Sequence, residues 1–120
     1  MELAVKVAGL GLRAGASLGS LLGALELLER PDALATSHGR ARLPVIAELA
    51  RILGLPLIAV DVAGIETPTR SARVLALCAT GSVAEAAAVA ALGRGARITC
   101  PRVISPDRMA SAALAEGDPP

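Results

Sequence analysis

The sequence predicts an α/β fold: a single domain of three layers (α/β/α), with helices on both faces of a mixed, mainly parallel sheet. Short apolar runs of strand length alternate with segments whose apolar residues repeat at helical spacing through most of the chain. Hydrophobic residues make up 53% and charged residues 19% of the 120 residues, which suffices for one packed core but not for two domains. We expect this domain to span residues 3–115 and to be followed by a disordered tail at residues 116–120.

The first half of the chain is predicted to hold three strands and two helices. The first strand, residues 3–8, is a continuous apolar run that stops at a glycine-rich segment. The first helix, residues 16–29, carries leucines along one face and is ended by Pro31. The pattern then predicts a strand at 33–36, a loop at 37–40, a helix at 44–53 closed by Gly54, and a strand at 57–60.

The second half is predicted to complete the sheet. Residues 61–71 are polar and contain Gly64 and Pro68, so they indicate a loop. A strand at 73–79 and a helix at 82–92, ended by Gly93, follow. The last two strands, 96–100 and 109–114, are joined through residues 101–108 without a helix. We therefore expect them to pair antiparallel, which makes the sheet mixed.

Charge and composition argue against several classes of partner. The chain has 12 basic and 11 acidic residues and a net charge of +1, and it contains no aromatic residue on which a base could stack. No apolar run is long enough to cross a bilayer, and the first residues lack the basic and apolar pattern of a signal peptide. We therefore expect a cytoplasmic protein that binds neither nucleic acid nor membrane.

Both cysteines, Cys78 and Cys100, lie in apolar sequence typical of strands. Neither has a histidine or a second cysteine at the spacing of metal ligands. We expect two buried, inert thiols, no metal site and no cofactor.

A glycine-rich segment at residues 9–15 joins the first predicted strand to the first predicted helix. Backbone N–H groups at a helix start attract anions, glycine permits close approach, and the Arg13 guanidinium can hold a carboxylate bidentately. The third glycine comes one residue too late for a dinucleotide fingerprint, and the Lys-Ser/Thr pair of a P-loop is absent. Two interpretations remain open: an anion site that includes Gly9, Gly11, Arg13 and Gly15, or a tight turn that packs strand against helix.

A second loop of this kind lies at Thr80, Gly81 and Ser82. Ser82 and Glu85 have the spacing of a capping box, which accounts for both residues without a ligand. Both glycine loops nevertheless follow strands, and ligands of open parallel sheets bind outside the carboxyl ends of the strands.

Three more polar residues are predicted near the same edge. His38, the only histidine, and Arg40 follow the second strand, and Arg102 lies between the last two strands. His38 is suited to acid–base work, although a solvated loop histidine is the alternative. Arg40 either faces the cleft or faces water.

Three parts of the chain, taken in order, carry a resemblance to a known family. They are residues 7–15; residues 34–36 with 49–50 and 53–57; and residues 79–86 running on to 101–102 and 104–110. Their order and spacing resemble the CobE family, equivalently the C-terminal domain of CbiG, of cobalamin (vitamin B12) biosynthesis. Leu12 stands where this family usually has a cysteine, whereas Arg40 keeps the positive charge that the family has after the second strand.

The resemblance implies a role in making the corrin ring. We expect a protein that binds a polycarboxylate precorrin or corrin intermediate, with carboxylates on the loop amides and on Arg13, Arg40 and Arg102. Leu12 and neighbouring aliphatic side chains would cover the macrocycle. One alternative is a hydrolase or rearrangement enzyme acting on a ring-contracted precorrin, with His38 as general base and Glu85 as a second acid–base group. Another is a non-catalytic docking partner of a precorrin methyltransferase. Whether the chain is an enzyme stays open at this point.

Overall fold

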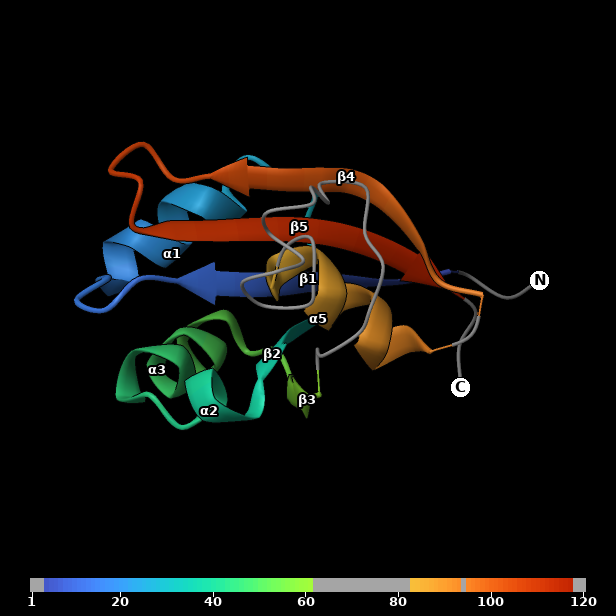
Figure 1. Cartoon of the computed structure of the whole chain (residues 1–120), viewed down its shortest axis with the longest axis horizontal. Helices are drawn as coiled ribbons and strands as arrows, with labels where there is room; N and C mark the ends of the chain where they lie inside the picture. Colours follow the sequence, from blue (N-terminus) through green and yellow to red (C-terminus); the bar gives the residue numbers. More distant parts are fainter. Residues whose placement is uncertain (1–3, 62–82, 94, 118–120) are drawn as a thin grey trace, which may run out of the picture.

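The computed structural model of the chain describes residues 4–61, 83–93 and 95–117 (Figure 1). In these residues five strands form one sheet in the order β3-β2-β1-β5-β4. Neighbours β1, β2 and β3 run parallel, whereas β5 runs antiparallel to both β1 and β4. The strands are β1 (Val5–Leu12), β2 (Ala33–Ser37), β3 (Leu57–Val60), β4 (Arg97–Ile104) and β5 (Ala110–Gly117). The sheet is therefore mixed, and the expected antiparallel pairing of the last two strands is confirmed.

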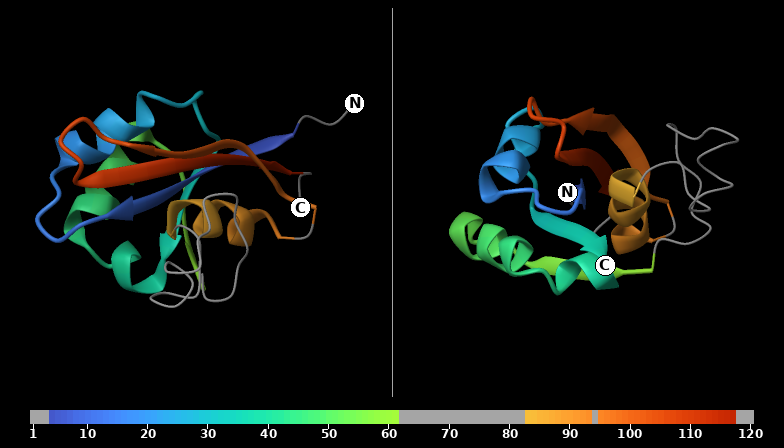
Figure 2. Two further views of the ribbon diagram at one scale, coloured as in Figure 1. Left: turned by 45° about the horizontal axis from the view of Figure 1, so that its top comes forward. Right: turned by 60° about the vertical axis from the view of Figure 1, so that its left-hand side comes forward.

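Helices cover both faces of the sheet, which confirms the three-layer α/β architecture (Figure 2). The helices described are α1 (Leu18–Leu25), α2 (His38–Ala41), α3 (Pro44–Leu53) and α5 (Val83–Leu92). Alternate side chains of a strand point to opposite faces. Leu10 of β1 accordingly packs with Leu21 of α1 and Leu49 of α3, whereas Val7 packs with Ala87 of α5. None of these helices, in the described residues, has the length and apolar character needed to cross a membrane.

Strand β1 and helix α5 lie in unusually close contact. A Cβ atom added to Gly9 would lie 1.7 Å from the carbonyl oxygen of Ala84 and 2.7 Å from the amide nitrogen of Ala88. Gly11 faces the same helix, since its added Cβ would lie 3.9 Å from the Cβ of Val83. Small residues on both sides thus allow backbone to approach backbone. This is why a helix made mostly of alanine can bury its surface on the sheet.

Strand β1 and helix α1 end at other residues than the sequence pattern predicts. Strand β1 continues to Leu12, so Gly9 and Gly11 lie within the strand and not in a loop. Helix α1 ends at Leu25 instead of residue 29, because the N–H groups of Leu27 and Leu28 bond to carbonyl oxygens three residues back and tighten the final turn.

Helix α3 and strand β3 match the sequence-based expectation, whereas residues 38–41 do not. Helix α3 ends as expected at Gly54, whose φ of 67° suits a left-handed cap, and β3 has its expected bounds. Residues 38–41 form the short helix α2 where we expected a loop, because the Ser37 hydroxyl accepts the N–H of Arg40.

The C-terminal strands are longer than the sequence pattern indicated. Strand β4 runs on to Ile104, and β5 includes Glu116 and Gly117, which we had assigned to the tail. Cys100 is a free, half-buried thiol on β4. The predicted strand at 73–79 with Cys78, the predicted loop beyond Asp61, and residues 118–120 lie outside the described residues.

Candidate functional site

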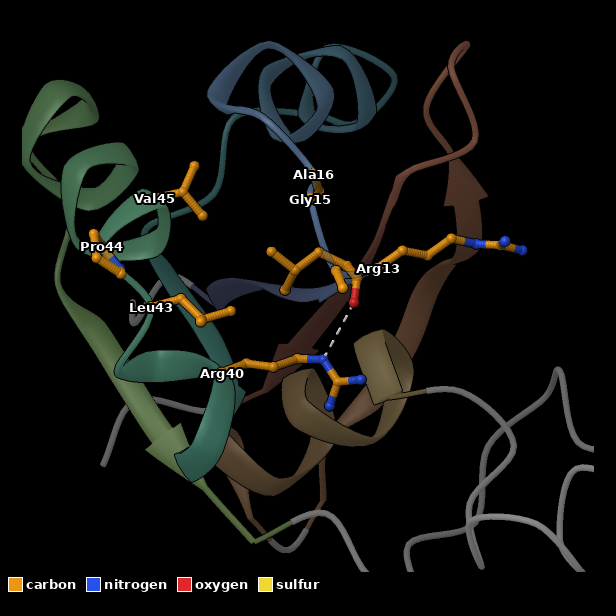
Figure 3. A pocket seen from close by; sticks show the side chains of 9 residues that line it. Arg13, Gly15, Ala16, Arg40, Leu43, Pro44 and Val45 are labelled. Atoms are coloured by element: carbon orange, nitrogen blue, oxygen red, sulfur yellow. Dashed lines mark hydrogen bonds between the residues drawn. The ribbon is translucent and has the colours of Figure 1, made fainter.

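A hollow of about 610 Å³ opens at the carboxyl ends of β1 and β2 (Figure 3). The turn after β1 forms one wall, and the segment that leads from α2 into α3 forms the other. The lining residues are mostly aliphatic and include two arginines. They are Leu12, Arg13, Ala14, Gly15, Ala16, Arg40, Leu43, Pro44 and Val45.

The position of this hollow follows from the sheet topology. From β1 the chain moves to β2 on one side, while β5 fills the other side of β1. Helices α1 and α5 lie on opposite faces of the sheet (Figure 2). The carboxyl ends of the parallel strands β1 and β2 meet at one edge, and ligands of open α/β sheets bind outside such strand ends.

The turn after β1 is fixed by backbone bonds. The Arg13 N–H donates to the Met109 carbonyl at 2.8 Å, and the Ala16 N–H donates to the Arg13 carbonyl at 3.0 Å. Gly15 has a φ of 86°, a left-handed conformation that glycine adopts without steric cost. These bonds hold the Arg13 main chain at the rim of the hollow.

The start of α1 is capped by its own side chains. The Ser17 hydroxyl accepts the Ser20 N–H at 3.1 Å, and the Ser20 hydroxyl accepts the Ser17 N–H at 3.2 Å. This reciprocal capping box uses amides that the sequence had suggested as anion donors. The cationic side chains at the hollow are consequently the stronger candidates for anion binding.

Arg40 is held in place at the bottom of the hollow. Its Nε donates to the Leu12 carbonyl at 3.5 Å, and its Nη1 donates to the Ser37 hydroxyl at 3.4 Å. The side chain is half-buried and comes from α2, immediately after β2. Figure 3 shows its guanidinium directed toward the end of β1. These two bonds leave further guanidinium N–H groups of Arg40 available to a ligand carboxylate.

Arg13 is arranged differently. It is exposed, and Figure 3 shows its side chain pointing away from Arg40, to the side on which β4 and β5 lie. In the described part of the chain, neither guanidinium forms an ion pair with a carboxylate. The rim therefore offers two separate cations: one anchored and one extended.

The structure brings together only part of the predicted site. Leu12, Arg13, Gly15 and Arg40 line the hollow, whereas His38 is exposed at the start of α2 and is not among the lining residues. Gly9 and Gly11 face α5 from within β1. The predicted positions Thr80, Gly81 and Ser82 lie outside the described residues.

Glu85 and Arg102 meet on the α5 side of the sheet. The Glu85 side chain is fully buried, and its carboxylate accepts the backbone N–H of Arg102 at 2.9 Å. The register of β4 against β5 shifts around Cys100, and Pro101 has no N–H to donate. This irregularity frees the Arg102 amide for Glu85.

Sequence reasoning missed a polar network at the turn between β4 and β5. The Asp107 carboxylate accepts hydrogen bonds from the hydroxyls of Ser105 at 2.6 Å and Ser20 at 2.5 Å, and from the Met109 N–H at 3.1 Å. These donors, first Ser105, lower the pKa of Asp107 below its ordinary value. The network ties this turn to α1, beside the hollow. Leu43 and Val45, which flank Pro44 at the start of α3, also line the hollow, and no local pattern in the sequence marks them as part of a site.

Comparisons with known proteins agree with this architecture. The family described as "Cobalamin synthesis G C-terminus" matches residues 6–115. The crystal structure of CobE, a protein from the cobalamin (vitamin B12) biosynthetic pathway, is similar with a TM-score of 0.72 and 29% identity, over 97% of this chain and 93% of that chain. The cobalamin biosynthesis protein ChiG from Agrobacterium tumefaciens is similar with a TM-score of 0.70 and 32% identity, over 92% of this chain and 97% of that chain. A comparison with curated proteins gave no match. Because the family match spans nearly the whole chain, the chain belongs to the CobE/CbiG C-terminal family of cobalamin biosynthesis proteins.

Proposed function

We propose that this protein binds a polycarboxylate precorrin or corrin intermediate in the hollow at the ends of β1 and β2. One observation carries the proposal: the half-buried guanidinium of Arg40, bonded to the Leu12 carbonyl, lies in a hollow whose other lining residues are mostly aliphatic. A tetrapyrrole intermediate combines an extended apolar ring with ionised carboxylates, so it matches both parts of this surface. The volume of about 610 Å³ lies within the range of small-molecule sites, about 300–1,000 Å³.

In this proposal, Arg40 and the aliphatic lining residues contact different parts of the ligand. Arg40 offers guanidinium N–H groups to one carboxylate, with its orientation held by Leu12 and Ser37. Leu12, Leu43 and Val45 present aliphatic surface to the ring. Leu43 is 40% exposed, and covering it with an apolar ligand removes that surface from water.

A protein of this kind would hold an unstable intermediate and pass it to other enzymes of the pathway, of which the precorrin methyltransferases are the expected partners. The hydrolase or rearrangement alternative depends on His38 and Glu85. His38 is outside the lining of the hollow, and the Glu85 carboxylate is engaged by the Arg102 amide. We therefore favour binding over catalysis.

The test is retention of a coloured ligand. Purified protein is mixed with hydrogenobyrinic acid or with a precorrin pool and desalted, and the visible spectrum is recorded. The chain has no Trp or Tyr, so absorbance retained near 280 nm also belongs to the ligand. Retention of an unchanged spectrum by the wild type, and its loss in Arg40→Ala, supports the proposal.

Other outcomes separate the alternatives. A changed spectrum or mass after incubation identifies an enzyme. No retention, together with co-purification with a methyltransferase, identifies a docking partner and removes the ligand role of the hollow. Arg97→Ala is the matched control, because it removes the same charge at the far end of β4.

A further inference from the structure

Arg108 adopts a backbone conformation that arginine normally avoids. Its φ is 63°, and among the described residues it is the only non-glycine with a positive φ. In this left-handed region the Cβ atom crowds the following carbonyl oxygen, so glycine or asparagine is the usual choice. An arginine there makes the turn less stable than glycine would.

The turn itself does not use the Arg108 side chain. The Arg108 N–H donates to the Ser105 carbonyl at 2.8 Å, and the Ser105 hydroxyl accepts the Ala110 N–H at 3.0 Å. The carboxylate of Asp107 is occupied by Ser20, Ser105 and Met109. In the described part of the chain, the Arg108 guanidinium forms no ion pair, and the residue is exposed.

Two hydrogen bonds hold this turn beside the hollow. The Arg13 N–H donates to the Met109 carbonyl at 2.8 Å. The terminal methyl of Met109 would lie 3.9 Å from a Cβ added to Gly15, which lines the hollow. On the far side, Asp107 bonds to Ser20 of α1. Arg108 directly precedes Met109, so its main chain lies close to that of Arg13. The Arg13 side chain points to the side on which β4 and β5 lie (Figure 3).

We infer that Arg108 and Arg13 form a second cationic subsite at the rim, which takes a carboxylate other than the one at Arg40. This inference rests on the proposed function and adds a specificity to it: the ligand must carry carboxylates on well-separated parts of its ring. A ligand with carboxylates on a single edge occupies the Arg40 subsite alone. The turn does not use the Arg108 side chain, so its charge is available to a ligand carboxylate.

The test compares two porphyrins in equilibrium binding. Uroporphyrin carries carboxylates around the whole ring, and mesoporphyrin carries them on one edge. Arg108→Asn keeps a residue that tolerates the left-handed conformation and removes the charge. We expect it to weaken uroporphyrin binding about fivefold, as for an exposed ion pair, and to leave mesoporphyrin binding unchanged. Arg40→Ala weakens both, and Arg97→Ala weakens neither.

Arg108→Gly supplies a second readout through urea unfolding followed by far-ultraviolet circular dichroism. We expect it to be at least as stable as the wild type while it loses uroporphyrin affinity, a combination that a purely structural role cannot give. Equal uroporphyrin affinity of wild type and Arg108→Asn overturns the inference and leaves the proposed function intact. If the wild type binds neither porphyrin nor hydrogenobyrinic acid, the inferred subsite and the proposed function are both wrong.

Discussion

Gly9 of β1 and Ala84 of α5 approach so closely that no side chain fits between them. A Cβ on Gly9 would lie 1.7 Å from the Ala84 carbonyl oxygen, and this oxygen belongs to backbone that cannot rotate away. The contact sets the distance between the sheet and α5. The glycine-rich motif at the start of the chain therefore has a packing role in addition to the turn it forms at Gly15.

The substitution Gly9→Ala is expected to destabilise the fold by about 3 kcal/mol or more, because the helix or the strand must shift. Urea unfolding followed by far-ultraviolet circular dichroism measures the loss. Gly39→Ala is the matched control: a Cβ at Gly39 meets nothing within 4 Å, and alanine favours the helix in which it lies. Equal stability of Gly9→Ala and wild type would refute the close contact.

Arg40→Lys tests whether the proposed binding needs a planar fork or only a charge. Lysine cannot reproduce the bonds from Nε and Nη1 that hold the guanidinium toward Leu12 and Ser37. We expect hydrogenobyrinic acid to bind Arg40→Ala about 10- to 100-fold more weakly than the wild type. Arg40→Lys should fall between the two in equilibrium titration. Wild-type affinity in the alanine variant would remove Arg40 from the site.

Arg13→Ala should have a smaller effect than Arg40→Ala, since Arg13 is exposed and contributes a solvent-screened contact. We expect about a fivefold loss of affinity, and the loss should shrink as salt is added. Titrations at two ionic strengths measure both effects. If Arg13→Ala binds the intermediate as tightly as the wild type, the rim has no part in recognition.

Asp107 predicts a defined pH dependence of stability. Hydrogen bonds from Ser105, Ser20 and the Met109 N–H lower its pKa below the ordinary 3.8. The unfolded chain therefore binds the proton more readily than the native state. The stabilisation by Asp107 is fully present above the ordinary value and is lost as the pH falls through the lowered one.

The variant Asp107→Asn isolates this contribution. It should unfold at lower urea than the wild type at neutral pH. The difference should narrow below about pH 4, where the Asp107 carboxylate of the unfolded chain begins to take up a proton that the native state still binds less readily. Glu26→Gln removes an exposed carboxylate that lies outside this network and serves as the control. If the stability difference between the wild type and Asp107→Asn stays constant down to pH 2, the stabilisation does not come from the ionised Asp107 carboxylate.

The sequence predicted best those elements whose ends carry local signals. Pro44 and Gly54 mark both ends of α3, and the structure has the helix between them. The same local reasoning fails at β1, because the glycine-rich segment predicts a loop although the strand continues to Leu12. Position 9 needs a glycine because helix α5, more than seventy residues further along the chain, packs directly against it. The Asp107–Ser20 bond joins the two ends of the domain in the same way, and no local pattern announces it.

The candidate site was predicted in part, through a rule of topology. Leu12, Arg13, Gly15 and Arg40 were assigned to one edge because they follow parallel strands, and they do line one hollow. This rule predicts the edge of the sheet at which a residue lies, but it does not predict the direction of its side chain. It therefore could not distinguish the anchored Arg40 from the extended Arg13, or place His38 away from the hollow.

The position of β5 between β1 and β4 has a consequence for folding during synthesis. Strand β5 comes last in sequence among the five strands and lies between β1 and β4. Residue 5 must therefore pair with residue 117 before β4 can join the rest of the sheet. A nascent chain on the ribosome cannot complete this sheet in steps. It must wait with two strand edges uncovered until its final strand emerges, and such long-range closure is slow. The sheet is therefore completed only after β5 has been synthesised.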